Sequence, residues 1–317
     1  MPGHCLRPAD PLNDAPEGEQ AAMAPRRSRK KDDKPRRSAA GAGRDGSDDN
    51  QQITEGEIED IEERSSPRTP VIYEVVRRHG EQEMVRPATS LWWSGLAAGL
   101  SISFSLLAQA ILQLGLPDEP WRPLIVSFGY SVGFIMVVLS RQQLFTENTI
   151  TVVLPVMAEL TPRNVGMLAR MWGIVLVANV AGTLFAALFC SFTPVITPEL
   201  KQAMLDISRH SVLNGGVIEM FLKGISAGFL IAAMVWLIPS AEAAQIFVIA
   251  LMTWLIAAGG SAHIVAGSMD GFMLIANGEL AWHRMVLDFF LPVLAGNIVG
   301  GTVLFALLSY AQVMNEI

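Results

Sequence analysis

Two stretches of this chain are too long and too apolar for an ordinary soluble domain. Residues 91–112 contain no Asp, Glu, Lys or Arg over 22 positions, and residues 171–190 contain none over 20. A helix rises about 1.5 Å per residue, so each stretch can cross the roughly 30 Å hydrocarbon core of a bilayer. The first begins too far from the amino terminus to be a cleaved signal peptide. The chain is therefore predicted to cross a membrane several times.

Charge divides the chain into two parts. Of 53 charged residues (23 Lys and Arg, 30 Asp and Glu), 33 lie in the first 90 positions. Residues 1–69 are rich in Pro, Gly, Ser and charge, a composition that cannot bury enough surface to fold, so we predict a disordered cytoplasmic tail. Its basic cluster at 26–37 and acidic run at 45–63 oppose each other, and the net charge is −7. Neither sign dominates, so no nucleic-acid partner is expected.

A short helix is predicted between the tail and the first crossing. Apolar residues recur at helical spacing between positions 71 and 76, just ahead of Arg77 and Arg78. This pattern favours an amphipathic helix at the bilayer surface over residues 70–88. Because 15 of the 23 Lys and Arg residues precede the first crossing, we expect both termini to be cytoplasmic.

Residues 89–313 are predicted to form an all-α polytopic membrane domain with six crossings. The expected crossings are 91–112, 124–158 with a polar break, 171–190, 215–238, 243–276 with a second break, and 289–312. Glycine pairs spaced four apart indicate close helix packing in lipid. They are Gly95 and Gly99, Gly129 and Gly133, Gly224 and Gly228, and Gly296 and Gly300.

An internal repeat relates the two halves of this domain. Residues 178–183 (ANVAGT) resemble 296–302 (GNIVGGT), GLAAG at 95 resembles GISAG at 224, and the broken crossing is second in each half. Each half has three crossings, an odd number, so the second copy is expected upside down. The predicted fold is a 3+3 inverted repeat with broken second and fifth helices.

The first break, residues 140–149, is too polar to face lipid. It is either an aqueous loop between two crossings or a loop inside the membrane. We favour the second interpretation, because the apolar piece that follows, 150–158, is too short to cross alone and contains Pro155.

The second break, residues 259–268, places two glycines and His263 midway through about 34 apolar residues. Half-helices that end there would point their N-termini at a central site, which suits an anion. Histidine has an ordinary pKa near 6.5, so His263 either adds a switchable proton or only ties down the loop. The functional interpretation needs a partner across the pore, and Thr146, at the corresponding place in the other half, is the candidate.

Three further ionisable groups lie in or near the crossings. Glu219 and Lys223 are four apart on the fourth crossing, so Lys223 either pairs with Glu219 or attracts anions. Asp270 follows the second break and is expected near the membrane interface.

Two motifs contain the interrupted segments, GYSVGFIMVVLSRQQLFTENT and SAHIVAGSMDG. Together they resemble the formate/nitrite transporter family over about residues 70–313, most closely its YfdC-like branch of bacterial inner-membrane proteins. The resemblance implies an aquaporin-like protomer, a homopentamer with one pore per subunit, and transport of small monovalent anions such as formate or nitrite. The chain shows no nucleophile–base pair, metal cluster or nucleotide-binding loop, so we expect no enzyme activity, no metal and no cofactor.

The resemblance also assigns residues to the pathway. The family's first-loop motif matches Leu144, Phe145 and Thr146, with Asn148 in the same loop, and its central histidine matches His263. Its apolar constrictions fall on Tyr130, Phe134 and Ile256. Three positions depart from the family's usual polar residues, namely Ala262, Gly267 and Gly228.

These observations predict a channel or transporter in which His263 protonates a weak-acid anion and lets it cross an apolar gate as the neutral acid. Two other classes stay open. One is a channel for water, glycerol or another neutral solute on a similar pore. The other is a membrane scaffold whose tail recruits partners while the pore is inactive.

Overall fold

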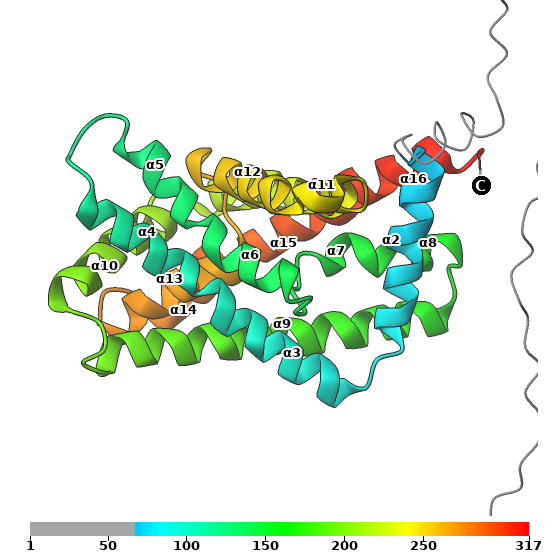
Figure 1. Ribbon diagram of the computed structural model, residues 1–317. Coiled ribbons are helices and arrows are strands. Elements are labelled where there is room, and N and C mark those ends of the chain that lie inside the picture. Colours follow the sequence, from blue (N-terminus) through cyan, green and yellow to red (C-terminus); the bar gives the residue numbers. More distant parts are fainter. Residues whose placement is uncertain (1–66, 317) are drawn as a thin grey trace, which may run out of the picture. The chain divides into compact units, whose positions relative to one another are not determined.

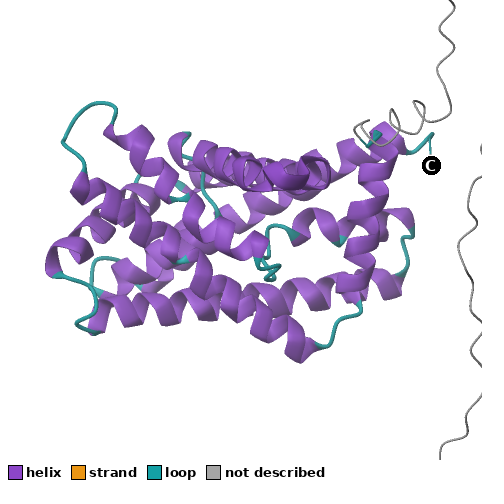
Figure 2. Cartoon of the chain, in the orientation of Figure 1, coloured by secondary structure: helices purple, strands orange, loops and turns teal. Residues whose placement is uncertain are grey.

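The structure, a computed structural model, describes residues 67–316, and every regular element in that range is a helix (Figures 1 and 2). The predicted all-α class is confirmed. The predicted disordered tail falls outside the described residues, apart from its last three positions. The remainder forms a bundle whose long helices run side by side (Figure 1).

Five helical segments are long and apolar enough to cross a membrane. They are Ala88–Gly115, Arg122–Leu139, Pro162–Phe192, Val217–Ala241 and Trp282–Val313. Three shorter apolar helices accompany them, at Asn148–Ala158, Gln245–Ala258 and Ile264–Ala276. These segments follow the predicted crossings, with most ends extended by several residues into the less apolar flanks.

The first half of the bundle contains two bent or broken crossings and one straight one. Its elements are α3 (Ala88–Ile102), α4 (Phe104–Gly115), α5 (Arg122–Gly129), α6 (Ser131–Leu139), α7 (Asn148–Thr151), α8 (Val153–Ala158) and α9 (Pro162–Phe192). The first crossing bends between α3 and α4, where the Ser103 hydroxyl donates to the Gly99 carbonyl at 2.8 Å. Such back-bonding to the preceding turn commonly bends membrane helices.

The second half also has its broken crossing in the middle position. Its elements are α11 (Val217–Ala241), α12 (Gln245–Ala258), α13 (Ile264–Ala276), α14 (Trp282–Arg284), a π-helical segment at Met285–Phe290, α15 (Leu291–Ile298), a second π-helical segment at Val299–Ala306, and α16 (Leu307–Val313). Figure 1 shows α9 running from the end that holds α8 to the end that holds α10, whereas the chain from α14 to α16 runs the opposite way. This opposition fits an inverted repeat, which for all six crossings stays a prediction.

The glycine pairs mark where helices touch. A Cβ added to Gly99 would lie 2.2 Å from the Asn179 carbonyl oxygen on α9, and a Cβ on Gly228 would lie 2.2 Å from the Asn297 carbonyl oxygen on α15. Any side chain there would push the two backbones apart. The glycines thus join α3 to α9 and α11 to α15 in the same way.

Helix α2 (Thr69–Met84) lies across the end of the bundle that also holds α16 (Figure 1). Tyr73 is buried and its ring centroid is 6.0 Å from that of Tyr310 on α16. Val71 and Val75 are exposed, at 46% and 49%. The helix was predicted at 70–88, and it ends four residues earlier because Pro87 begins the next segment. The two described ends of the chain lie at the same end of the bundle (Figure 1).

Helix α10 (Pro198–Leu213) was not predicted; it lies between the third and fourth predicted crossings. The Thr197 side chain accepts a hydrogen bond from the Leu200 N–H and caps the helix, with Pro198 in the first turn. A Thr-Pro-Glu start is a recognisable signal for a helix N-terminus. This helix contains about as many polar as apolar residues. Its sequence therefore has no long apolar stretch, which is the signal used to predict the crossings.

Candidate transport site

The first interrupted crossing is held by one buried side chain, Asn179 of α9. Its Oδ1 accepts from the Phe145 N–H at 2.9 Å, and its Nδ2 donates to the carbonyls of Gly95 and Gln143, each at 2.8 Å. The chain between α6 and α7 has left the helix, so the Phe145 N–H and the Gln143 carbonyl lack helical partners. Asn179 supplies them, and the loop stays ordered inside the bundle.

The second interrupted crossing is held in the same way by Asn297 of α15. Its Oδ1 accepts from the Ile264 N–H at 2.8 Å, and its Nδ2 donates to the carbonyls of Gly224 and Ala262, each at 2.9 Å. Both asparagines belong to the repeated sequence at 178–183 and 296–302. The repeat was recognised in the sequence, but its role as a pair of loop clamps was not.

The clamps fix which residues of the two loops correspond. Asn179 bonds the groups on either side of Leu144, and Asn297 bonds those on either side of His263. Leu144 is therefore the counterpart of His263. The prediction that Thr146 occupies the corresponding place was wrong by two residues, because motif spacing alone does not give the register of a loop.

Thr146 and His263 nevertheless meet. The Thr146 hydroxyl lies 2.6 Å from Nε2 of His263, and both side chains are buried. On the other side of the ring, Nδ1 of His263 accepts from the Ala266 N–H at 3.2 Å and caps the first turn of α13. Since Nδ1 is an acceptor, the proton of the neutral ring is on Nε2 and is donated to Thr146. This hydrogen bond thus joins the loops of the two interrupted crossings.

Aromatic side chains surround this pair. The ring of Phe134 stands edge-on to the ring of His263 with centroids 5.0 Å apart, and Tyr130 lies 5.1 Å from Phe134. In the first loop, Phe145 packs edge-on against Trp172 at 5.6 Å. The histidine therefore sits in apolar surroundings, with Thr146 as its polar neighbour across the loops.

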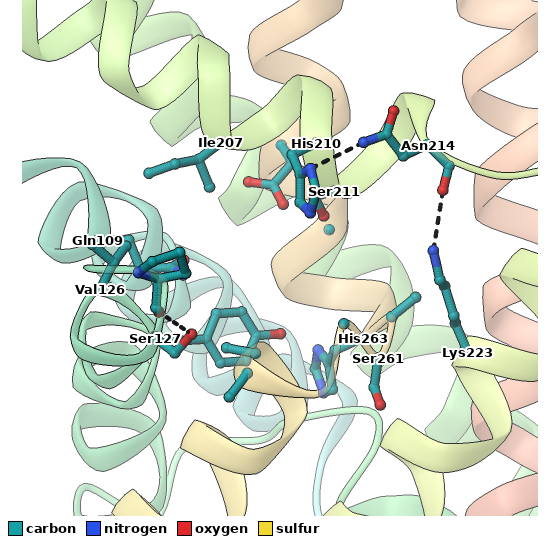
Figure 3. Close-up of a pocket in the computed structure, with 18 of the residues that line it drawn as sticks. Gln109, Val126, Ser127, Ile207, His210, Ser211, Asn214, Lys223, Ser261 and His263 are labelled. Atoms are coloured by element: carbon teal, nitrogen blue, oxygen red, sulfur yellow. Dashed lines mark hydrogen bonds between the residues drawn. The ribbon is translucent and has the colours of Figure 1, made fainter. Parts of the chain in front are cut away.

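A cavity of about 720 Å³ leads to His263 (Figure 3). It lies among α4, α5, α10, α11 and the second loop. Its wall includes the predicted residues Tyr130, Lys223 and His263. The other predicted pathway residues, Leu144, Phe145, Thr146, Phe134, Ile256 and Asn148, do not line this cavity. His263 marks its inner end, with Thr146 directly behind.

Asn148 has a local role in the first loop. Its Nδ2 donates to Oε1 of Gln143 at 3.1 Å, and its Oδ1 accepts from the Thr151 hydroxyl at 3.1 Å. These bonds connect the loop to the first turns of α7. The pathway role predicted for Asn148 stays a prediction.

Lys223 stands on the cavity wall with its charge already partnered. Its ammonium group is 2.7 Å from Oε1 of Glu219 and donates to the Asn214 carbonyl at 3.1 Å (Figure 3). The pairing interpretation of Lys223 is confirmed in this geometry. The ammonium still faces the cavity, so the two interpretations are compatible.

Asp270 is 7% exposed and lines the same cavity as His263. Its expected place near the membrane interface stays a prediction. Its burial could not be predicted, because the sequence of α13 does not reveal that α10 packs over it. Asp270 is the main residue of the site that the sequence argument did not place.

Two of the departures from the family's usual residues have steric reasons. A Cβ on Gly267 would lie 2.4 Å from Cζ of Phe289, so that ring fills the space of a longer side chain. Gly228 touches the backbone of Asn297 and has no room for any side chain. The third, Ala262, gives its carbonyl to the clamp at Asn297. At Gly267 and Gly228, the packing of this chain leaves no room for the polar side chains that are usual in the family.

Comparison with known proteins decides the family. Residues 70–311 match the formate/nitrite transporter family. The chain belongs to it. It is 48% identical over 259 residues to the inner membrane protein YfdC of Escherichia coli (strain K12), with 82% of this chain and 83% of that protein covered. The formate channel FocA of Haemophilus influenzae is 28% identical over 157 residues, covering 48% of this chain and 54% of FocA.

Solved structures of the family share the fold. A pentameric formate channel with formate bound has a TM-score of 0.61 at 20% identity and covers 72% of this chain and 98% of its own. An ion channel of the same family has a TM-score of 0.63, also at 20% identity, with 77% and 98% covered. The resemblance drawn from the two motifs is confirmed. The chain is a multi-pass membrane protein of a transporter family, not an enzyme.

Proposed function

We propose that this chain conducts small monovalent anions, with formate and nitrite as the first candidates, through a pore that narrows at Thr146 and His263. The observation that carries the proposal is the 2.6 Å hydrogen bond between these residues, which joins both interrupted crossings at the inner end of the cavity. The similarity to a formate channel of Haemophilus influenzae and to a pentameric formate channel supports it. We further propose a homopentamer in a bacterial inner membrane, with both termini cytoplasmic.

An anion would enter the cavity past Lys223 and approach the N-terminus of α13, where His263 is the capping residue. Beyond it the path meets the apolar side chains around the histidine. We assign Phe134, Ile256, Leu144 and Phe145 to this constriction, with Tyr130 at its cavity side. Carrying an unpaired charge through such a gate costs several kcal/mol, so the neutral acid passes more easily.

His263 would provide the proton. In the observed geometry its ring is neutral, with Nδ1 accepting from the Ala266 N–H. To act as an acid it must first bind a proton at Nδ1 and release that backbone group. The imidazolium then transfers one proton to the anion, which becomes the neutral acid, and the ring returns to its capped, neutral form. Protonation of Nδ1 breaks the hydrogen bond from the Ala266 N–H and is therefore costly. We propose that it takes place only when an anion lies beside the ring.

Flux into proteoliposomes tests the proposal. Formate, nitrite, acetate, lactate and hydrosulfide uptake is measured with and without a pH gradient, in wild type, His263→Asn and the control His210→Asn. Asparagine keeps a helix-capping group, and His210 is an exposed histidine on the same cavity wall. We expect anion uptake that depends on the pH gradient in wild type and His210→Asn and loses that dependence in His263→Asn. Unchanged dependence in His263→Asn contradicts the proton role.

The same vesicles separate the other two classes. Osmotic swelling in glycerol or other neutral solutes without anion flux would indicate a neutral-solute channel. A scaffold predicts undetectable flux together with a cellular phenotype that disappears when residues 1–65 are deleted. Either result would overturn anion conduction.

A further inference from the structure

We propose that Asp270 is a proton-binding residue of the cavity, and that its charge controls access of anions to His263. The inference rests on the proposed anion conduction and adds a control residue to it. It begins from position. His263, Gly267 and Asp270 all line the cavity and lie at i, i+4 and i+7 along α13. That spacing places them on one helix face, with Asp270 roughly 10 Å along the axis from His263.

The cavity wall between the carboxyl and the histidine includes Gly267, which has no side chain. The ring of Phe289 fills the space that a side chain at Gly267 would take. An anion that moves along α13 toward His263 therefore passes Asp270 first. Asp270 as a residue is 7% exposed and lines the cavity, so its carboxyl is shielded from bulk water.

Asp270 has no counter-charge among the residues that the structure describes. Its polar neighbours are two hydroxyls of α10, those of Ser208 and Ser211, and the Ser208 hydroxyl donates to Oδ1 at 3.5 Å. The cations of the cavity are occupied elsewhere. Arg122 of α5 is 2.7 Å from Asp118, and Lys223 of α11 is 2.7 Å from Glu219.

The other titratable groups on the cavity wall do not neutralise Asp270 either. From α10, Asp206 pairs with Arg209, and Nδ1 of His210 is 2.9 Å from the amide of Asn214. Tyr130, at the junction of α5 and α6, is neutral near pH 7 as a phenol. The remaining group, His263, is neutral while it caps α13.

The charge of Asp270 then decides what the cavity accepts. An ionised carboxylate and an anion in one narrow, partly dry cavity repel each other strongly, because few water molecules screen them. A protonated carboxyl removes this repulsion and can donate a hydrogen bond to the anion. Asp270 binds a proton from hydronium in the cavity, which leaves water, and returns the proton to cavity water when it ionises again. Anion uptake becomes fastest when this carboxyl is protonated.

Uptake of formate and of nitrite by the full-length protein in proteoliposomes tests the inference, with equal pH on both sides stepped from 5 to 8. The measured quantity is the ratio of the Asp270→Asn rate to the wild-type rate, because other pH effects, including those of His263, cancel in it. Asparagine has the shape of aspartate and can keep the Ser208 contact. We expect the ratio to rise from near one at the acid end to about ten at the alkaline end.

Two variants complete the experiment. Asp270→Glu retains a titratable carboxyl, so its rate should fall with pH as in wild type. Asp206→Asn removes a cavity acid that already has a partner, and its ratio should stay near one. A ratio for Asp270→Asn that is constant with pH, or an equal rise for Asp206→Asn, overturns the inference. A wild type that conducts neither anion overturns the proposed function and this inference together.

Discussion

The two interrupted crossings are built by the same device and carry different chemistry. In each, an asparagine from a neighbouring crossing bonds one N–H and two carbonyls, and a glycine on the opposing helix touches the backbone of that asparagine. The residue at the centre of the clamp is Leu144 in the first loop and His263 in the second. The scaffold thus repeats, while the functional side chains do not.

The loops also differ in what surrounds them. Gln143 of the first loop donates to Glu83 of α2 at 2.8 Å, which ties the loop to the helix at the end of the bundle. Its counterpart in the second loop, Ala262, has no polar side chain, and that loop opens on the cavity instead. One loop is therefore tethered, and the other faces the cavity that Asp270 and Lys223 line.

Removing the clamps should have the largest effect on stability. Asn179→Ala and Asn297→Ala each leave a buried loop N–H and carbonyl without partners, which costs about 3 kcal/mol. Unfolding by denaturant in detergent micelles, followed by tryptophan fluorescence, measures the loss. The control is Asn164→Ala at a half-buried position outside both loops, with about 0.5 kcal/mol expected. If one clamp costs much less than the other, the two loops are not held in the same way.

Adding a methyl group at the glycine contacts between helices should have the second-largest effect on stability. Gly99→Ala and Gly228→Ala each place a Cβ 2.2 Å from a carbonyl oxygen, so the helices must separate, at about 2 kcal/mol each. Gly173→Ala, where nothing lies within 4 Å of the added Cβ, should be neutral or stabilise the helix by up to about 1 kcal/mol. The same unfolding measurement applies. A tolerated Gly228→Ala beside a damaging Gly99→Ala would show that the second half is packed more loosely.

Removing the Glu83 carboxylate, which accepts the hydrogen bond from Gln143 in the first loop, should cause the smallest loss of stability. That loss should depend on pH. Burial raises the pKa of Glu83, but hydrogen bonds from His79 and Arg86 lower it more, so its pKa lies below the ordinary 4.5. A lowered pKa contributes stability above the ordinary value that is lost as the pH falls below it. Glu83→Gln should cost about 1 kcal/mol at pH 7 and little at acid pH.

Unfolding at several pH values between 3 and 7 checks this. Glu74 and Glu279 also have lowered pKa values, held down by hydrogen bonds from arginines, and they destabilise the wild type in acid in the same direction. The difference between Glu83→Gln and wild type isolates the tether. A difference that is independent of pH would mean that the charge of Glu83 does not hold the loop.

Much of this architecture follows from the sequence because a bilayer imposes a length. Apolar length gave the crossings, and polar residues at membrane depth gave both loops, including Thr146 and His263. The clamps did not follow, since Asn179 and Asn297 lie 34 and 33 residues from the loop N–H groups they bind. The burial of Asp270 and the presence of α10 were not predicted for a related reason. The burial of a residue depends on which distant segment of the chain packs over it.

The central claim is that the two loops form one conducting site through Thr146 and His263. A double-mutant cycle on anion flux in proteoliposomes tests it most directly, with Thr146→Val, His263→Asn and the two combined. Groups that act as a unit give non-additive losses. We predict that the combined variant conducts no more slowly than the worse single variant. Losses that multiply would show that the two residues act independently, and would contradict the single site.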